Sequence, residues 1–389
     1  RCIFIGSDPT YNPINYLDRN GKFIVRGEPE LALLELVNAL RDAKDIKHLK
    51  EIKGISFFNG GNIVENPSRE PTWDLDSLPM PDRKLIKNPQ MYEIPKLKRL
   101  ATIILTSRNC YAQCKYCVPC SLSFARELEY KKGNECKPRP TMHSAERVIE
   151  EFKEIARIGY KSVGIIDDNF AMDRERVKEI CRGIKDLGIS WTCLSRADNL
   201  NDDEMLELMK QAGCKSVDIG VESFNQEILD DIRKGMKVET VEQVLSKLNK
   251  HKISVQFNIL LGASPLETDN TIENTLTKAR SLSRKYNIRY IFFNVCSPFP
   301  GTEFYYEAKK NGWMIYDEYQ PTDGTRESQI SYPHLSKERL EYWLHKAYRD
   351  QYFSPRGILM QMASIRSFYD LKYKIKTALK MYDIHFNKK

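Results

Sequence analysis

Thr106-Ser-Arg-Asn-Cys110-Tyr-Ala-Gln-Cys114-Lys-Tyr-Cys117 places three cysteines on one loop at C-x3-C-x2-C spacing. The loop directly follows an apolar run, residues 101–106, that has the length and composition of a buried strand. Three thiolates suit a 4Fe-4S cluster that leaves one iron open to another ligand, whereas an electron-transfer ferredoxin usually supplies four. A structural zinc site also uses four ligands, commonly from two separated pairs.

Two further cysteines keep a second interpretation open. Cys120 continues the three-residue spacing of Cys114 and Cys117, and Cys136 follows in the same region. A four-thiolate zinc or ferredoxin site would use one of them. The chain would then be a non-catalytic iron-sulfur or zinc protein that binds a partner through its basic surface.

Short apolar runs alternate with amphipathic stretches from residue 101 to about residue 296. This alternation is typical of repeated βα units with a parallel sheet. Each connection is long enough for a right-handed crossover, so we expect an α/β fold. The predicted strands span residues 101–106, 162–166, 189–194, 216–221, 253–261 and 288–295. The predicted helices span residues 145–158, 174–187, 202–212, 238–251 and 271–282.

The segments on either side of this array differ from it. Several prolines indicate a linker or lid over residues 71–83. Upstream, residues 23–25 and 30–43 predict one strand and one helix, which is a single βα unit. Downstream, residues 336–349 and 357–382 predict a mostly helical tail. The expected parts are residues 1–95, 96–314 and 315–389.

The composition fits a globular enzyme. Hydrophobic residues make up 41% and charged residues 29% of the 389 positions. No apolar run approaches the roughly 20 residues that a membrane-spanning helix needs. Ten cysteines spread thinly over the chain, with no signal peptide before them, favour a cytoplasmic protein. The chain begins at Arg1 and runs at once into a strand-like segment, so we expect that its beginning is missing.

The net charge of +8 comes partly from a lysine-rich end. Lysines at 372, 374, 376, 380, 388 and 389 are interspersed with apolar residues. The pattern is typical of a solvated helix, and the alternative is a basic amphipathic surface for peripheral membrane contact. No basic stripe with regular aromatic interleaving is present, so nucleic acid is not expected as a partner.

With these motifs, residues 101–314 resemble the radical S-adenosylmethionine superfamily. The resemblance implies a partial (β/α)6 TIM-type barrel, with the cluster on Cys110, Cys114 and Cys117 and with Tyr116 against the adenine. The amino and carboxylate groups of S-adenosylmethionine would chelate the open iron. One electron, delivered by a donor such as flavodoxin or ferredoxin, would cleave the carbon-sulfur bond and give a 5'-deoxyadenosyl radical.

The strand ends supply further candidates, because active sites of parallel barrels gather at the carboxyl ends of the strands. Asp167 and Asp168 follow the second strand and resemble the acidic motif that receives the ammonium group of S-adenosylmethionine. The alternative is that one of them caps the next helix. Arg196 follows the third strand and would pair either with the ligand carboxylate or in a structural salt bridge.

Two more motifs end the fourth and fifth strands. Gly220-Val-Glu222-Ser223 resembles the G-x-E-S segment of the family, which implies that Glu222 or Ser223 contacts the ribose or the amino acid part of the ligand. Gly262 would let the backbone approach the adenine, or would simply turn the chain. The turn after it is one residue longer than the Pro-Gly-Glu-Thr pattern of the family, which weakens the placement of Glu267.

The flanking segments resemble the cobalamin-binding branch of this superfamily. Residues 6–9, 25–30 and 75–83 look like the connection that follows a Rossmann-like cobalamin domain, so residues 1–95 are interpreted as a short remnant of that domain. The cobalamin-ligating D-x-H-x-x-G motif is absent from the sequence, which leaves cobalamin open as a cofactor. The branch implies a methyltransferase or a ring-rearranging enzyme acting on a small molecule, a lipid or a peptide.

Overall fold

The computed structural model describes residues 2–17, 23–42, 45–92, 97, 100–286, 288–317, 319–320, 323–363, 365 and 368–386. The lysines at 388 and 389 lie outside the described residues. The chain forms two compact units. Unit 1 comprises Arg1–Tyr111, Val118–Ser195 and Asp202–Lys215, and unit 2 comprises Ala112–Cys117, Arg196–Asn201 and Ser216–Lys389.

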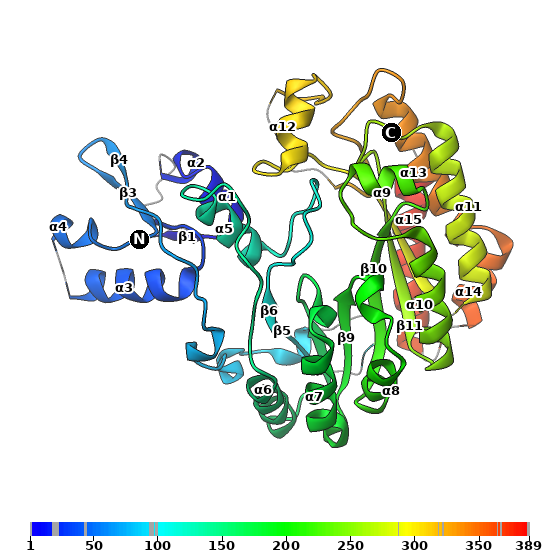
Figure 1. Ribbon diagram of the computed structural model, residues 1–389, viewed down its shortest axis with the longest axis horizontal. Coiled ribbons are helices and arrows are strands. Elements are labelled where there is room, and N and C mark those ends of the chain that lie inside the picture. Colours follow the sequence, from blue (N-terminus) through cyan, green and yellow to red (C-terminus); the bar gives the residue numbers. More distant parts are fainter. Residues whose placement is uncertain are drawn as a thin grey trace. The chain divides into compact units, whose positions relative to one another are not determined.

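Unit 1 begins with a four-stranded sheet in the order β1-β2-β3-β4, drawn in blue in Figure 1. β1 (Ile3–Ile5) is parallel to β2 (Phe23–Val25), and β3 (Ile55–Asn59) is antiparallel to both β2 and β4 (Asn62–Glu65). Helix α3 (Pro29–Arg41) buries its apolar face against this sheet. The other helices of the segment are α1 (Ser7–Tyr11), α2 (Ile14–Leu17) and α4 (Ile46–Leu49).

This sheet corrects the expectation of a single βα unit upstream of the array. β2 and α3 confirm the predicted strand and helix, but the hairpin of β3 and β4 is absent from the prediction. The hairpin turns at Gly60 and Gly61, which both have positive φ, and a Gly-Gly pair is typical of such turns. The segment is therefore a small sheet with a core of its own.

The proline-containing segment that we interpreted as a linker or lid is fastened to unit 1. Leu75 and Arg83 are buried in it, and the Arg83 Nη2 donates to Glu151 of α6 (Ala145–Arg157) at 2.6 Å. Its regular structure consists of the 3-10 helices η1 (Leu75–Ser77) and η2 (Arg83–Leu85), and η3 (Pro89–Met91) follows further along the chain.

Unit 1 continues with three parallel strands that confirm the first three predicted strands. β8 (Ser162–Ile165) pairs with β5 (Ala101–Ile104) on one side and with β9 (Ser190–Ser195) on the other. The helices α7 (Arg174–Ile184) and α8 (Asp203–Gln211) follow β8 and β9, and each begins at an aspartate side chain that caps it. The cysteine loop connects a two-residue strand, β6 (Ser107–Arg108), to α5 (Ser121–Tyr130), and β6 pairs with β7 (Thr141–Met142).

Unit 2 contains the other three predicted strands, again parallel. β11 (Ser254–Leu261) pairs with β10 (Cys214–Glu222) and with β12 (Ile288–Val295). The side chains of β11 alternate between buried and half-buried positions. The helices of the unit are α9 (Gln226–Asp231), α10 (Val238–Lys250), α11 (Asp269–Lys285), α12 (Glu303–Lys310), α13 (Lys337–Tyr352), α14 (Pro355–Ala363) and α15 (Phe368–Phe386), and the 3-10 helix is η6 (Ala197–Leu200).

The helical tail packs on β12 through α13. The Tyr348 hydroxyl donates to the Phe293 carbonyl at 2.9 Å, and the Tyr352 hydroxyl donates to the Ile291 carbonyl at 2.8 Å. Helix α15 packs against α13, and the predicted single helix over 357–382 is two helices. The tail thus covers the strand with which the parallel array of unit 2 ends.

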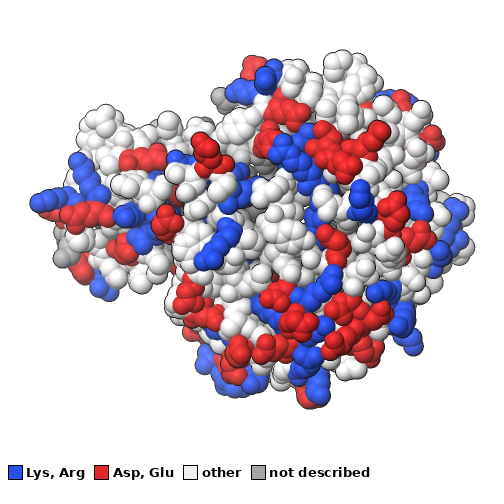
Figure 2. All heavy atoms as spheres, viewed as in Figure 1, with Lys and Arg blue, Asp and Glu red and all other residues white. Residues whose placement is uncertain are grey.

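The chain is therefore an α/β protein with three parallel strands in each unit and an additional N-terminal sheet. Within the described ranges, no helix combines the length and the apolar character that crossing a membrane would require. Positive and negative side chains are interspersed over the face shown in Figure 2.

Candidate functional site

Asp168 anchors both ends of the cysteine loop. One oxygen of its carboxylate accepts the backbone N–H of Asn109 at 3.0 Å, and the other accepts that of Cys120 at 2.8 Å. Burial raises the pKa of this carboxyl, and the N–H donors offset part of the effect. The loop between residues 109 and 120 is therefore closed by one side chain from the end of β8.

Asp167 holds the residues just before the loop. Its carboxylate accepts the backbone N–H and the hydroxyl of Thr106, both at 2.6 Å, and the Ser107 hydroxyl at 2.7 Å. Burial raises its pKa more than these donors lower it. Neither Asp167 nor Asp168 caps α7, which begins at Arg174 and is capped by Asp173. The capping alternative is therefore wrong, and contact of the pair with an ammonium group stays a prediction.

Cys110 lies beside Asn169, a residue that the sequence analysis did not select. The Asn169 Nδ2 donates to the Cys110 sulfur at 3.7 Å, and its Oδ1 accepts the Ser195 hydroxyl at 2.9 Å. Hydrogen bonds of this kind commonly orient the ligands of a metal site.

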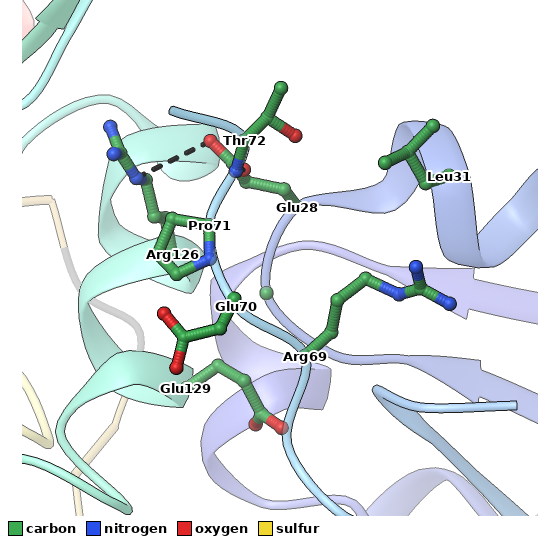
Figure 3. A pocket seen from close by; sticks show the side chains of 9 residues that line it. Glu28, Leu31, Arg69, Glu70, Pro71, Thr72, Arg126 and Glu129 are labelled. Atoms are coloured by element: carbon green, nitrogen blue, oxygen red, sulfur yellow. Dashed lines mark hydrogen bonds and ion pairs between the residues drawn. The ribbon is translucent and has the colours of Figure 1, made fainter. Parts of the chain in front are cut away.

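A buried charge network ties the residues before Cys110 to the N-terminal sheet. Arg108 donates to Glu28 and to Glu30, each at 2.6 Å. Figure 3 shows Glu28 also paired with Arg126, whose Nε lies 3.4 Å from the carboxylate. Burial lowers the pKa of Arg108, and the two carboxylates raise it by more. The Arg-Gly-Glu segment that we compared with a cobalamin-domain connection thus fixes the entry to the cysteine loop.

In unit 2, Lys115 fastens the second half of the loop. Its backbone N–H donates to the Ile232 carbonyl at 3.2 Å, and its carbonyl accepts the N–H of Phe304 at 3.0 Å. Its buried ammonium forms ion pairs with Asp231 at 2.9 Å and with Glu307 at 3.1 Å. The segment that carries Cys114 and Cys117 is thereby attached to the turn after α9 and to α12.

The orientation of the Glu222 side chain is determined by an irregular end of β10. The register with β11 shifts between Gly220 and Glu222, and Glu222 has a φ of 64°, a left-handed conformation that residues with a side chain seldom adopt. Its carboxylate accepts the Lys234 ammonium at 2.8 Å and bonds the Tyr116 hydroxyl. Backbone strain of this kind is often kept where it places a functional group.

The pair of Glu222 and Lys234 lies close to the cysteines. Burial lowers the pKa of Lys234, but the charges of Glu222 and of Cys114 raise it by more. Burial raises the pKa of Tyr116 strongly, with further contributions from Glu222 and from the thiols of Cys114 and Cys117. The structure therefore brings Tyr116, Glu222 and two of the three predicted cluster ligands together, with a buried ammonium among them.

Arg196 makes the structural salt bridge that we considered as its alternative role. Its guanidinium bonds both oxygens of Asp198, at 3.0 and 2.9 Å. It also donates to the backbone carbonyls of Lys234 at 2.6 Å and Gly235 at 3.1 Å. These bonds fix the backbone that carries the Lys234 ammonium, and pairing of Arg196 with a ligand carboxylate stays a prediction.

Ser223 and Gly262 are engaged elsewhere in unit 2. The Ser223 hydroxyl bonds that of Thr275 at 3.1 Å. Gly262, with φ 71°, donates its N–H to Glu267 at 2.6 Å and accepts the Tyr332 hydroxyl at 3.0 Å. Burial raises the pKa of Glu267 to about 8, and the N–H groups of Gly262 and its neighbour lower it in part. Contact of Ser223 or Gly262 with a ligand stays a prediction.

The surroundings of the cysteines fit the cluster that the motif implies. All ten cysteines are thiols, and the part of the chain that the structure describes gathers no group of three or more His, Cys, Asp or Glu for a single metal ion. Around the motif, an N–H group faces the Cys110 sulfur and an ammonium lies near Cys114. These surroundings fit thiolate ligands, because both favour negative charge on sulfur.

Residues 104–279, which run from the end of β5 through the cysteine loop to α11, match the Radical SAM superfamily. This segment of the chain is therefore assigned to the Radical SAM superfamily. Among the relatives of this Radical SAM chain is an uncharacterized methyltransferase of Pyrococcus horikoshii, 28% identical over 365 residues, which are 92% of this chain and 73% of the relative. Another is the bacteriochlorophyllide d C-12(1)-methyltransferase of Chlorobaculum tepidum, 26% identical over 235 residues, 58% of this chain and 48% of the relative.

The Radical SAM fold is also found in solved structures. The cobalamin-dependent S-adenosylmethionine radical enzyme OxsB, solved with aqua-cobalamin and S-adenosylmethionine, is 15% identical to this chain with a TM-score of 0.68, covering 99% of this chain and 58% of OxsB. The chain thus spans about half the length of some of its relatives. Membership of the superfamily implies a 4Fe-4S cluster and S-adenosylmethionine as cofactors.

Three residues of this Radical SAM site were not predicted from the sequence. Asn169 adjoins the acidic pair and could have been found from its position alone. Lys234 lies 12 residues after Glu222, and Arg108 lies 80 residues after Glu28. No local pattern connects such partners, since only the folded backbone brings them together.

Proposed function

We propose that this protein is a cobalamin-dependent Radical SAM methyltransferase, with its 4Fe-4S cluster on Cys110, Cys114 and Cys117. The observation that carries the proposal is the cysteine loop, which Asp168 closes at both ends and which Lys115 fastens in the middle. Such a loop presents ligands at fixed positions, as a cluster site requires. The relatives named as methyltransferases support the type of reaction.

When bound, the cluster would supply the electron that cleaves S-adenosylmethionine. The residues of this chain would hold and orient the ligand and exclude water. Tyr116 presents a half-buried ring beside the cysteines, which suits contact with an adenine. The other predicted contacts to the ligand are those of Asp167, Asp168, Arg196, Glu222, Ser223 and Gly262.

Cobalamin and the barrel belong to the same proposal. OxsB is described as cobalamin-dependent, and its fold covers nearly all of this chain, which supports a partial (β/α)6 TIM-type barrel and a cobalamin site in the whole protein. The four-stranded sheet in residues 1–95 would be the remnant of the cobalamin domain. The sequence of this chain contains no D-x-H-x-x-G motif, so the four-stranded sheet would not itself supply that histidine to cobalamin.

The experiment is anaerobic reconstitution with iron and sulfide, followed by dithionite and S-adenosylmethionine. We expect about four irons per chain and formation of 5'-deoxyadenosine. Cys114→Ala should abolish both, whereas Cys120→Ala, the matched control on the same loop, should leave both unchanged. Equal losses in the two variants would indicate a four-thiolate site and contradict the proposal.

The partners that we propose are a low-potential electron donor of the flavodoxin or ferredoxin type and an anionic membrane surface. Helix α15 supports the membrane contact. Its inner side is held to α13 by a bond between the Nδ1 atoms of His345 and His385 at 2.9 Å. Next to this side runs a partly exposed apolar stripe of Phe368, Leu371, Ile375, Leu379, Tyr382 and Phe386, of which Tyr382 and Phe386 also contact Phe353.

The spacing of that stripe, three or four residues throughout, keeps it on one side of the helix. The exposed lysines at 372, 376 and 380 lie along one edge of it. A helix with an apolar stripe beside a lysine row matches a membrane interface that carries negative lipid headgroups. A lipid or lipophilic small molecule would then be the substrate class that this surface favours.

A further inference from the structure

We propose that the buried charges of Lys234 and Glu222 shift the reduction potential of the cluster on the cysteine loop in opposite directions and balance each other in the wild-type protein. In this pair Lys234 favours the reduced cluster and Glu222 favours the oxidised one. Both are positioning residues, because they act on the cluster through their charge and not through a bond to it. The inference rests on the proposed function, since it requires that Cys110, Cys114 and Cys117 hold the cluster.

Hydrogen bonds hold the backbone of Lys234, the residue that carries the ammonium. The Lys234 N–H donates to the Leu229 carbonyl at 2.8 Å, and its carbonyl accepts the Arg196 guanidinium at 2.6 Å. Two residues earlier, the Ile232 carbonyl accepts the N–H of Lys115, which lies between Cys114 and Cys117 in unit 2. The turn that carries Lys234 is thus bonded directly to the segment that carries two of the cysteines.

The space for the pair is created by Gly220. A Cβ atom at Gly220 would lie 2.6 Å from the Glu222 Oε1 and 3.0 Å from the Lys234 Nζ. Lys234 is 6% exposed and Glu222 is 8% exposed, so water screens neither charge well. Buried charges act over longer distances than surface charges, because the surrounding dielectric constant is low.

Reduction of the cluster adds one electron from an external low-potential donor and neither forms nor breaks a bond. The added negative charge is stabilised by a nearby cation and destabilised by a nearby anion. In the wild-type protein the two charges of the pair oppose each other. Removing either charge alone should therefore shift the potential, and the two removals should shift it in opposite directions.

The neighbouring residue provides a matched control. Arg233 forms an ion pair with Glu303 at 2.7 Å, but the side chains of this pair are 55% and 52% exposed. Arg233→Met changes the net charge as Lys234→Met does, one position earlier in the chain. Because solvent screens exposed charges, we expect little effect of Arg233→Met on the potential.

The test is a redox titration of the reconstituted holoprotein, followed by the paramagnetic resonance signal of the reduced cluster. We compare wild type, Lys234→Met, Glu222→Gln, the double variant and Arg233→Met at equal iron and sulfide content. At a fixed solution potential, the ratio of reduced to oxidised cluster should fall roughly tenfold in Lys234→Met and rise roughly tenfold in Glu222→Gln, about 59 mV each way. The double variant should return toward wild type.

The inference is overturned if both single variants shift the potential in the same direction, or if Lys234→Met shifts it no more than Arg233→Met. If Lys234→Met fails to assemble a cluster, Glu222→Gln decides, and an unchanged or lowered potential in that variant rejects the inference. Failure of the proposed function has a different signature, because wild type itself would then hold no cluster of the expected type.

Discussion

Gly220 shows how one absent side chain can shape a site. Because a Cβ at this position would meet both Glu222 and Lys234, we expect Gly220→Ala to separate the ion pair and to lower the free energy of unfolding by about 1–3 kcal/mol. Denaturant unfolding of the apoprotein measures the loss. Gly133→Ala is the control, since a Cβ there would meet nothing within 4 Å. Equal stability of the two variants would show that the pair can shift to make room.

The substitution Asp168→Asn replaces one carboxylate oxygen by an NH2 group and tests whether Asp168 closes the cysteine loop. In Asp168→Asn, one of the N–H donors of Asn109 and Cys120 would face the amide nitrogen and lose its acceptor. We expect at least a several-fold drop in iron incorporated per chain. Asp173→Asn is the matched control, because asparagine also caps a helix well. Full iron loading of Asp168→Asn would contradict a role for the carboxylate in holding the loop.

The turn after β11 should make the free energy of unfolding depend on pH. Buried Glu267, whose pKa is raised from 4.5 to about 8, lies near Cys296 and Tyr332, and Gly262 donates to it. Between these two pH values the folded state holds a proton that the unfolded state has lost. The stability contributed by the protonated carboxyl should therefore fall as the pH rises from about 4.5 to about 8.

Denaturant unfolding at several pH values across this window measures the effect. Glu267→Gln keeps a neutral, hydrogen-bonding side chain and should flatten the dependence. If the stability of this variant varies with pH as steeply as that of wild type, another group is responsible.

Helix α15 is expected to bind membranes that carry negative charge. Wild type should sediment with vesicles that contain phosphatidylglycerol and much less with pure phosphatidylcholine. Replacing the lysines at 372, 376 and 380 by glutamine should weaken this binding by about 1 kcal/mol for each charge, and added salt should weaken wild type likewise. The control replaces Lys247, Lys250 and Lys252. Equal losses in both triple variants would exclude a specific role for α15, and concentration-dependent dimerisation through the stripe would indicate a second copy as its partner.

For the whole molecule, the sequence predicted the repeating elements better than the interactions between them. All six strands of the array lie where the periodicity predicted them, because each is a short apolar run with its own turn signals. The β3-β4 hairpin was not predicted, because its strands are short and their side chains do not alternate cleanly between buried and exposed positions. The cysteine loop was recognisable from its spacing, whereas the ion pairs of Glu222 with Lys234 and of Glu28 with Arg108 depend on tertiary contacts.

The whole chain also provides the test for cobalamin. Reconstituted protein incubated with hydroxocobalamin should keep the cobalamin absorbance after desalting, and the retained amount should approach one per chain. Cluster content measured on the same sample separates this question from cluster assembly. A protein that holds its cluster and forms 5'-deoxyadenosine but loses all cobalamin would be a Radical SAM enzyme without the cobalamin step.

The closure of the cysteine loop by Asp168 has an entropic consequence. A free loop of this length must give up much of its conformational freedom when its ligands gather around a metal. Here the two ends are already joined through one carboxylate, and the middle is bonded to the turn after α9. These bonds are formed by protein groups alone, so they would lower the entropic cost of gathering the ligands. Cluster assembly should add little to the cooperativity of folding, and the apoprotein should keep a native-like loop that is ready for metal.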